Sequence, residues 1–154
     1  MGMKTRHMSE LANEPTNDEK LFSLLSHISF FFGALVLPLV FWIINKDKSK
    51  FVAFNSLQAL FFQLATTVII IVTITAIAVI TILSGAMNDG TPHTWVMLIL
   101  LFLYGVFMIA IFWSGIYSVY MGVKSYRGEM KEYPIIGKIV YKKVFGTSYS
   151  NVPQ

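Results

Sequence analysis

Two long stretches of this chain contain no side chain that is charged at neutral pH. One covers residues 57–83, and the other covers residues 95–123, where tyrosine is the sole ionisable type. Each exceeds the roughly 20 residues that a helix needs to cross the hydrocarbon of a bilayer. The first is rich in Val, Ile and Thr, which favour strands in water, but in lipid a lone segment can satisfy its backbone only as a helix. The two stretches therefore predict two transmembrane helices.

The composition of the chain agrees with a membrane protein. Of its 154 residues, 55% are hydrophobic and 13% are charged, about half the charged fraction of an ordinary soluble domain. The mean hydropathy is +0.64. The chain has no cysteine, which excludes disulfides, thiol catalysis and zinc–thiolate sites. We expect an all-α, polytopic helical membrane protein.

A third apolar segment, residues 21–44, is interrupted and contains a histidine, His27. Gly33 and Pro38 lie within it, and Pro38 leaves the carbonyl of Ala34 without its helical partner. The segment is long enough to cross the membrane once with a kink. It is equally suited to enter and return as a re-entrant hairpin. The sequence therefore predicts either three spans or two spans plus a hairpin.

The basic residues predict which side of the membrane each loop occupies. Lys46, Lys48 and Lys50 precede the first long stretch, whereas the loop 84–94 has neither Lys nor Arg. Six basic residues follow the second stretch: Lys124, Arg127, Lys131, Lys138, Lys142 and Lys143. The positive-inside rule places both basic regions and the C-terminus in the cytoplasm, with 84–94 outside. The first 20 residues hold as many basic residues as 46–50, so the side of the N-terminus stays open.

The chain divides into three predicted regions: a polar tail (1–20), a helical membrane domain (21–123) and a basic tail (124–154). The basic tail can form a short amphipathic segment, with Lys138 and Lys142 on one side. Its predicted apolar side consists of Ile135, Ile136, Ile139, Val140 and Val144. Each lysine near anionic lipid contributes about 1 kcal/mol to membrane binding. The basic residues that set the membrane topology explain the isoelectric point of about 9.3. Nucleic acid is therefore not an expected partner.

Polar and small residues form a row on each long apolar stretch. Residues four apart on a helix share a face, and two such rows can be read from the sequence. The first row is Asn55, Ala59, Gln63 and Thr67, with Gln58 beside it, and the second is Ala110, Ser114, Ser118 and Gly122. Small residues let helices approach closely and amides bond between helices, so we expect the two rows to meet. The alternative is that the amides line a hydrated path.

The histidine in the first apolar segment has two interpretations. An ionisable residue within the membrane is a functional candidate by default. A neutral imidazole bonded to Ser23, one turn back, or to the amides of 57–83 is the structural alternative, which we prefer because a proton relay would need a carboxylate at that depth. The three histidines, His7, His27 and His93, are not at metal-ligand spacing. We therefore predict no catalytic residue, cofactor or metal.

Several motifs together resemble a known family. They are His27 with Ser29, Pro38, Trp42, the charged run from Lys46 to Phe51, Gln58–Ala59 with Phe62–Gln63, Gly128–Glu129 and Tyr133–Pro134. Over residues 19–140 the chain resembles the bacterial family of small membrane proteins of unknown function that is related to the Tic-twenty-like chloroplast import component and to magnetosome-membrane proteins of the MamF type. Family members often have Asn before the Phe–Gln pair, where this chain has Phe61.

The resemblance implies a polytopic protein of the bacterial inner membrane without enzymatic activity. Two functions follow as hypotheses. The first is a scaffold or assembly subunit that associates with itself or with other membrane proteins through its small-residue and amide faces. The second is a component of a transport or protein-translocation complex. We favour the scaffold because no carboxylate lies within the apolar segments to couple transport to protons or cations.

Overall fold

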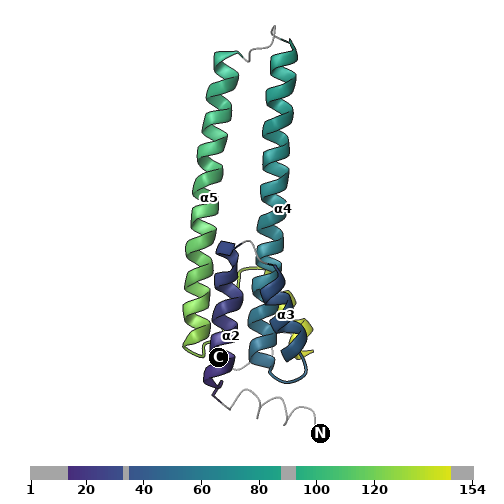
Figure 1. Ribbon diagram of the computed structural model, residues 1–154, viewed down its shortest axis with the longest axis vertical. Coiled ribbons are helices and arrows are strands. Elements are labelled where there is room, and N and C mark those ends of the chain that lie inside the picture. The colour runs from purple at the N-terminus through teal and green to yellow at the C-terminus, as the bar shows by residue number, and fades with distance from the viewer. Residues whose placement is uncertain (1–13, 33–34, 88–92, 147–154) are drawn as a thin grey trace. The chain divides into compact units, whose positions relative to one another are not determined.

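The computed structural model of the chain describes residues 14–32, 35–87 and 93–146. These residues form helices α2 (Asn17–Ile28), α3 (Val36–Asn45), α4 (Lys50–Met87), α5 (Thr94–Tyr126) and α6 (Ile136–Phe145), with a 3-10 turn, η1 (Ser29–Phe32), after α2 (Figure 1). The part of the chain that the structure describes contains no strand. The all-α prediction is confirmed.

The chain forms two compact units, which are described separately. Unit 1 combines residues 1–63 with 117–154. It therefore contains α2, η1, α3 and α6, together with the first part of α4 and the last part of α5. Unit 2, residues 64–116, contains the remaining parts of α4 and α5.

The two long helices, α4 and α5, correspond to the two predicted spans. They contain 38 and 33 residues, and both are long and apolar enough to cross a membrane. The prediction of two such helices is confirmed, although α4 begins earlier than expected, at Lys50. Within their most hydrophobic windows, only 0% and 6% of the residues are buried by the rest of the molecule. These surfaces are therefore free to contact lipid or other helices.

Helix α2 begins at a complete capping box. The Thr16 hydroxyl accepts a hydrogen bond from the Glu19 N–H at 3.3 Å, and the Glu19 carboxylate accepts one from the Thr16 N–H at 2.7 Å. This reciprocal pair satisfies two backbone donors that a helix start otherwise leaves free. The cap explains why α2 begins at Asn17, before the apolar segment itself.

The interrupted segment forms a hairpin of two short helices. Pro38 is the third residue of α3, where its missing N–H costs nothing because first-turn donors have no helical acceptor. Phe22 of α2 stacks on Phe41 of α3, with ring centroids 5.1 Å apart. Helices of 12 and 10 residues are about 18 and 15 Å long, against about 30 Å of hydrocarbon. The interrupted segment is therefore two short packed helices and not one continuous helix.

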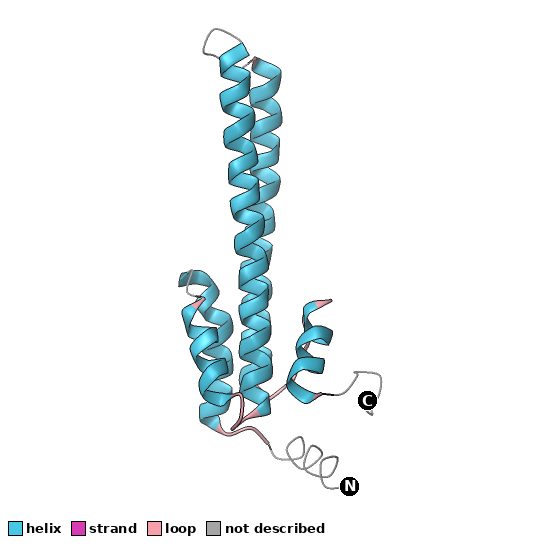
Figure 2. Cartoon of the chain, turned by 90° about the vertical axis from the view of Figure 1, so that its right-hand side faces the viewer, coloured by secondary structure: helices cyan, strands magenta, loops and turns pink. Residues whose placement is uncertain are grey.

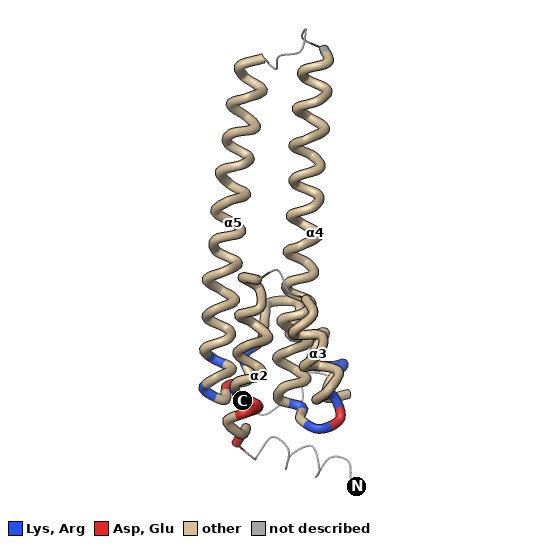
Figure 3. The backbone as a smooth tube through the Cα atoms, viewed as in Figure 1, with Lys and Arg blue, Asp and Glu red and all other residues tan. Residues whose placement is uncertain are grey.

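Both ends of this hairpin lie at the same end of unit 1. The Glu19 carboxylate near the start of α2 bonds to Ser49, which follows the loop after α3. Figure 3 places the charged residues of the α2 start, of that loop and of the end of α5 together at this end. The chain therefore enters and leaves the hairpin on one side, and that side carries the charge.

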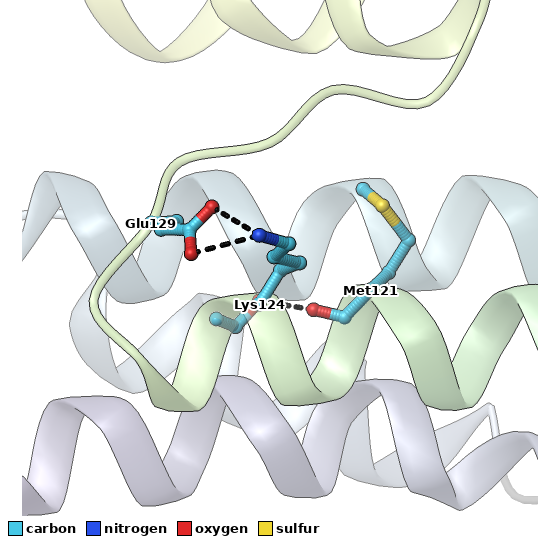
Figure 4. A network of polar contacts seen from close by, with 4 residues as sticks. Met121, Lys124 and Glu129 are labelled. Carbon is cyan, nitrogen blue, oxygen red and sulfur yellow. Dashed lines mark hydrogen bonds and ion pairs between the residues drawn. The ribbon is translucent and has the colours of Figure 1, made fainter.

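The chain turns twice between α5 and α6. The first turn uses Gly128, whose φ of +82° favours glycine, and an ion pair of 2.9 Å between Lys124 and Glu129 closes it (Figure 4). The second is centred on Ile135, with φ 70° and ψ −60°, where the Ile136 N–H bonds to the Pro134 carbonyl at 2.8 Å. These values define a classic γ-turn, which is rare and strained.

Helix α6 packs on α4 within unit 1 (Figure 2). The buried cluster between them consists of Phe54, Leu57, Val140, Tyr141 and Phe145. The predicted apolar side of α6 is wrong in part. Ile136 and Val144 pack against this cluster, but Ile135 and Ile139 are 79% and 60% exposed. The buried stripe instead includes Gly137, Tyr141 and Phe145, because residues three and four apart share a helical face.

Candidate functional site

The interior of unit 1 contains a cluster of buried polar side chains, which we call the polar core. It consists of Ser23, Ser26, His27 and Ser29 of the hairpin, Asn55, Ser56, Gln58 and Gln63 of α4, Ser118 and Ser125 of α5, and Tyr133 of the following loop. Each is at most 4% exposed. Buried polar groups are stable only when they are hydrogen-bonded, so the partners of these residues define what the cluster does.

The first task of the polar core is to complete the C-terminal end of α2. The last four carbonyls of a helix have no partner within it. Gln63 of α4 donates to the Ser26 carbonyl at 3.1 Å, and Ser118 of α5 donates to the His27 carbonyl at 2.8 Å. Gln63 also donates to the Ser29 hydroxyl at 2.9 Å. Side chains from two long helices therefore add donors at the end of α2, beside those of Ser29, whose hydroxyl donates to the Ser26 carbonyl at 2.8 Å and whose N–H bonds to the His27 and Leu25 carbonyls.

The second task is to hold the loop that follows α5. Gln58 donates to the Lys131 carbonyl at 3.1 Å and accepts from the Tyr133 N–H at 2.8 Å. One side-chain amide thus pairs with two backbone groups of an irregular segment. A Cβ atom on Gly137 would lie 2.5 Å from the Glu132 Cβ and 3.1 Å from the Gln58 oxygen. The loop and the start of α6 are therefore closely fitted around this amide.

His27 is fully buried and bonds to Tyr133. Its Nδ1 lies 3.2 Å from the Tyr133 hydroxyl, and the Asn55 amide also interacts with the imidazole. The predicted partner Ser23 is wrong, because its buried hydroxyl has no hydrogen-bond partner among the described residues. Tyr133, which the sequence analysis noted only as part of a motif, is the missed partner. Residues this distant in sequence meet only through the fold.

The two predicted rows each contact α2. Ser118 and Gln63 bond to it as described above, and a Cβ on Gly122 would lie 3.3 Å from the His27 Cβ and 3.5 Å from the Leu24 carbonyl. The Gln63 side chain donates its hydrogen bonds to Ser26 and Ser29 and not to the α5 row.

A hydrogen bond joins the two long helices directly in unit 1, where the rings of Phe62 of α4 and Tyr117 of α5 also lie 6.4 Å apart. Ser125 of α5 donates to the Asn55 side-chain oxygen at 2.8 Å, one turn beyond the predicted row. Ala59 of the first row is also buried there.

The other members of both rows belong to unit 2. Thr67 and Ser114 are half-buried and Ala110 is exposed. The Ser114 hydroxyl donates to the Ala110 carbonyl at 2.8 Å, so it is satisfied within its own helix. These positions present small side chains on the helices of unit 2.

The motif residues behind the family resemblance support the hairpin and the loop. Pro38 is fully buried at the start of α3, and Trp42 packs against the apolar cluster with its ring 5.9 Å from the Lys143 amine. Lys46 is exposed in the loop after α3. Pro134 is exposed next to the buried Tyr133, where it supplies the carbonyl of the γ-turn. The described residues include no group of three or more His, Asp and Glu that could hold a metal.

Comparison with known proteins identifies a family. No individually curated protein and no solved structure matches the chain. One family model, described as the magnetosome magnetite crystal formation protein family (MamF/MmsF), matches residues 18–140. The match covers the hairpin, both long helices and the loop that carries Tyr133. It confirms the magnetosome part of the expected relationship and does not extend to the Tic-twenty-like component. The chain therefore belongs to the MamF/MmsF family of magnetosome membrane proteins.

Proposed function

We propose that this chain is a non-enzymatic membrane scaffold, an assembly subunit that helps to organise a compartment of bacterial inner-membrane origin such as the magnetosome. The observation that carries the proposal is the inverted organisation of unit 1. Its interior contains the polar core beside the apolar α4–α6 cluster, whereas Leu21, Phe32 and Ile44 on the outside of the hairpin are 43%, 78% and 53% exposed. Apolar side chains are stable in that position when lipid, not water, surrounds them.

The hydrogen bonds of the polar core support a structural role for its amides. Asn55, Gln58 and Gln63 all hydrogen-bond to protein groups. Gln58 and Gln63 bond to backbone carbonyls in a loop and at the end of a helix. Non-helical backbone at membrane depth is tolerated where protein buries it. The amides thus allow a hairpin to end inside the hydrocarbon.

We further propose that both ends of the hairpin, together with the C-terminus, face the cytoplasm, and that loop 84–94 lies outside. Support comes from the clustering of charge at the open end of the hairpin (Figure 3). On the same unit, Ile135 just before α6 and Ile139 within it are exposed beside the exposed Lys138 and Lys142. This combination suits the boundary between anionic headgroups and acyl chains. The γ-turn also supports this placement at the membrane boundary, because it keeps the Ile135 side chain exposed even though the backbone there is strained.

The helices of unit 2 offer the surface for association. Ala110 and Ser114 are small, and the hydroxyl of Ser114 is satisfied within its helix. Small residues let a second helix approach closely, which is the main source of affinity between helices in lipid. We therefore assign self-association, or binding of other membrane proteins, to this part of α5.

Oligomeric state in native-lipid particles tests the scaffold. We expect the full chain to be isolated as an oligomer or with membrane-protein partners, and Ser114→Leu to lower the associated fraction severalfold. Ala78→Leu is the matched control, since it enlarges an exposed alanine of α4 in the same unit. A monomer without partners, or equal effects of the two variants, would contradict the proposal.

A transport component is the second candidate, and the buried Ser23 hydroxyl favours it. This group has no partner among the described residues, as expected where water enters. Single cysteines at Gln63, Thr67 and Val68 distinguish the two functions. A scaffold protects Gln63→Cys from a small water-soluble thiol reagent, whereas a hydrated path leaves Gln63→Cys and Thr67→Cys reactive and Val68→Cys unreactive.

The same reagent chemistry tests the orientation. With an impermeant reagent in spheroplasts, we expect His93→Cys to react, and Asn17→Cys and Lys46→Cys to react only after lysis.

A further inference from the structure

A pocket of about 320 Å³ opens at the charged end of unit 1. Four segments that are distant in sequence form it: the start of α2, the loop before α4, the turn after α5 and the end of α6. Phe51 and Phe145, both buried, contribute apolar walls. Its volume falls in the range of about 300–1,000 Å³ that is typical of small-molecule sites. The pocket is separate from the polar core, with which it shares no residue.

Charges of both signs line this pocket. Glu14 and Glu19 belong to the α2 side, and Lys48 and Lys50 belong to the α4 side. Among the described residues the one ion pair joins Lys124 to Glu129, so these four groups are not paired with each other. Lys50 is also the first residue of α4, where the helix dipole is positive. The pocket therefore has an anion-binding side and a cation-binding side.

Glu19 is held in place and ionised. Partial burial by itself raises the pKa of this carboxyl, but hydrogen bonds from Ser49 and Thr16 outweigh it and leave the pKa below its ordinary value. The Thr16 hydroxyl and N–H lie 3.0 and 2.7 Å from one of its oxygens. A fixed negative charge thus occupies one wall at neutral pH.

The pocket lies next to the apolar outer surface of the hairpin. Leu21, two residues after Glu19, is 43% exposed, and Ile44, four residues before Lys48, is 53% exposed. At 1.5 Å per helical residue, two residues of α2 span about 3 Å. If lipid tails cover these apolar side chains, the pocket is at the depth of the headgroups.

We propose that this pocket binds the phosphate–ammonium zwitterion of an aminophospholipid headgroup. The phosphate lies against Lys48 and Lys50, because lysine binds phosphate as a point charge. The ammonium lies against Glu14 and Glu19 and donates hydrogen bonds to them. The proposal needs the chain to be in a membrane, but it does not depend on the scaffold function.

Lipid retention by the full chain in detergent, followed by native mass spectrometry, tests the site. The probes are phosphatidylethanolamine, phosphatidylcholine and phosphatidylglycerol, with soluble phosphoethanolamine in a separate arm. We expect phosphatidylethanolamine to bind about tenfold more tightly than phosphatidylglycerol, which has no ammonium, a ratio that corresponds to about 1.4 kcal/mol. Phosphatidylcholine, whose ammonium cannot donate a hydrogen bond, should be intermediate.

Two variants link that preference to the pocket. Glu19→Gln keeps a capping box, because Gln serves there as well as Glu, and removes only the charge. It should remove the preference for phosphatidylethanolamine over phosphatidylglycerol, and Lys48→Gln should weaken retention of both. Lys142→Gln is the matched control, since it removes an exposed lysine of α6 outside the pocket.

Each remaining outcome is decisive. If soluble phosphoethanolamine binds as tightly as the lipid, the zwitterion site is supported with a free ligand as its source. If only lipids bind, the headgroup is the source. Equal retention of the three lipids would overturn the proposal, as would an equal loss in Lys48→Gln and Lys142→Gln.

Discussion

Units 1 and 2 satisfy their backbones in opposite ways. In unit 2 the described residues form continuous parts of α4 and α5, so nearly every backbone group has its helical partner and the side chains can all be apolar or small. In unit 1 the chain ends α2 at Ile28 and passes through an irregular loop at 127–135. Side chains of Gln58, Gln63 and Ser118 supply the missing bonds there. Gln58, Gln63 and Ser118 thus mark places where a neighbouring backbone stops being helical.

The comparison predicts that the same substitution on α5 has opposite consequences in the two units. Gly122 of unit 1 lies against α2, whereas a Cβ on Gly105 of unit 2 would meet nothing within 4 Å. We expect Gly122→Leu to lower the free energy of unfolding by about 3 kcal/mol, because it forces α2 from α5. Gly105→Leu should be neutral or stabilising by up to about 1 kcal/mol, through helix propensity.

Unfolding in mixed micelles, followed by circular dichroism, measures both variants. A similar loss in both would mean that α2 and α5 do not approach closely at Gly122. The closely packed surroundings of Gly122 would then not differ from the open surroundings of Gly105.

Loss of a side-chain amide should have the next largest effect. Gln58→Leu leaves the Lys131 carbonyl and the Tyr133 N–H without partners, which costs about 2 kcal/mol of stability. Hydrogen exchange at the Tyr133 amide should accelerate at the same time. In unit 2, Thr81 donates to the carbonyl of Ile77 in its own helix, so Thr81→Val should change stability by less than about 0.5 kcal/mol. Unchanged protection of the Tyr133 amide in Gln58→Leu would show that the amide does not hold the loop.

The smallest expected effect is a dependence on pH that belongs to unit 1. Burial raises the pKa of Glu19, but hydrogen bonds from Ser49 and Thr16 lower it by more than burial raises it. The pKa in the folded state is therefore below the ordinary 4.5. A lowered pKa means that the ionised carboxylate stabilises the folded state fully above pH 4.5 and that this contribution is lost as the pH falls through the folded value. Thermal melting of the wild type and of Glu19→Gln should therefore differ at neutral pH and converge in acid. A constant difference at all pH values would assign the effect to the cap alone.

Much of the helical architecture could be predicted from the sequence. Charge-free stretches at 57–83 and 95–123 are longer than a membrane is thick, and they lie within α4 and α5. Gly33 and Pro38 marked the interruption of the first segment, and Pro38 does belong to the first turn of α3. These signals are local, because helix length, hydropathy and proline geometry depend on neighbours along the chain.

The partners of the polar side chains could not be predicted in this way. Periodicity placed Gln63 and Ser118 on facing rows, but it could not show that α2 provides the partners of both. It gave no sign that His27 bonds to Tyr133, or that α6 turns Ile139 outward and Phe145 inward. These contacts and orientations involve residues that are far apart in the sequence, and the sequence does not show how close such residues lie in space.

The sequence alone therefore determined that this chain is helical, apolar and divided between charged and uncharged regions, because these properties follow from composition and local geometry. Only the tertiary structure decided that the first segment returns as a hairpin and that Gln63 of α4 bonds to the end of its first helix. The physical reason is that an unsatisfied carbonyl at the end of a helix accepts any suitable donor in reach. Which donor that is depends on which helices pack together.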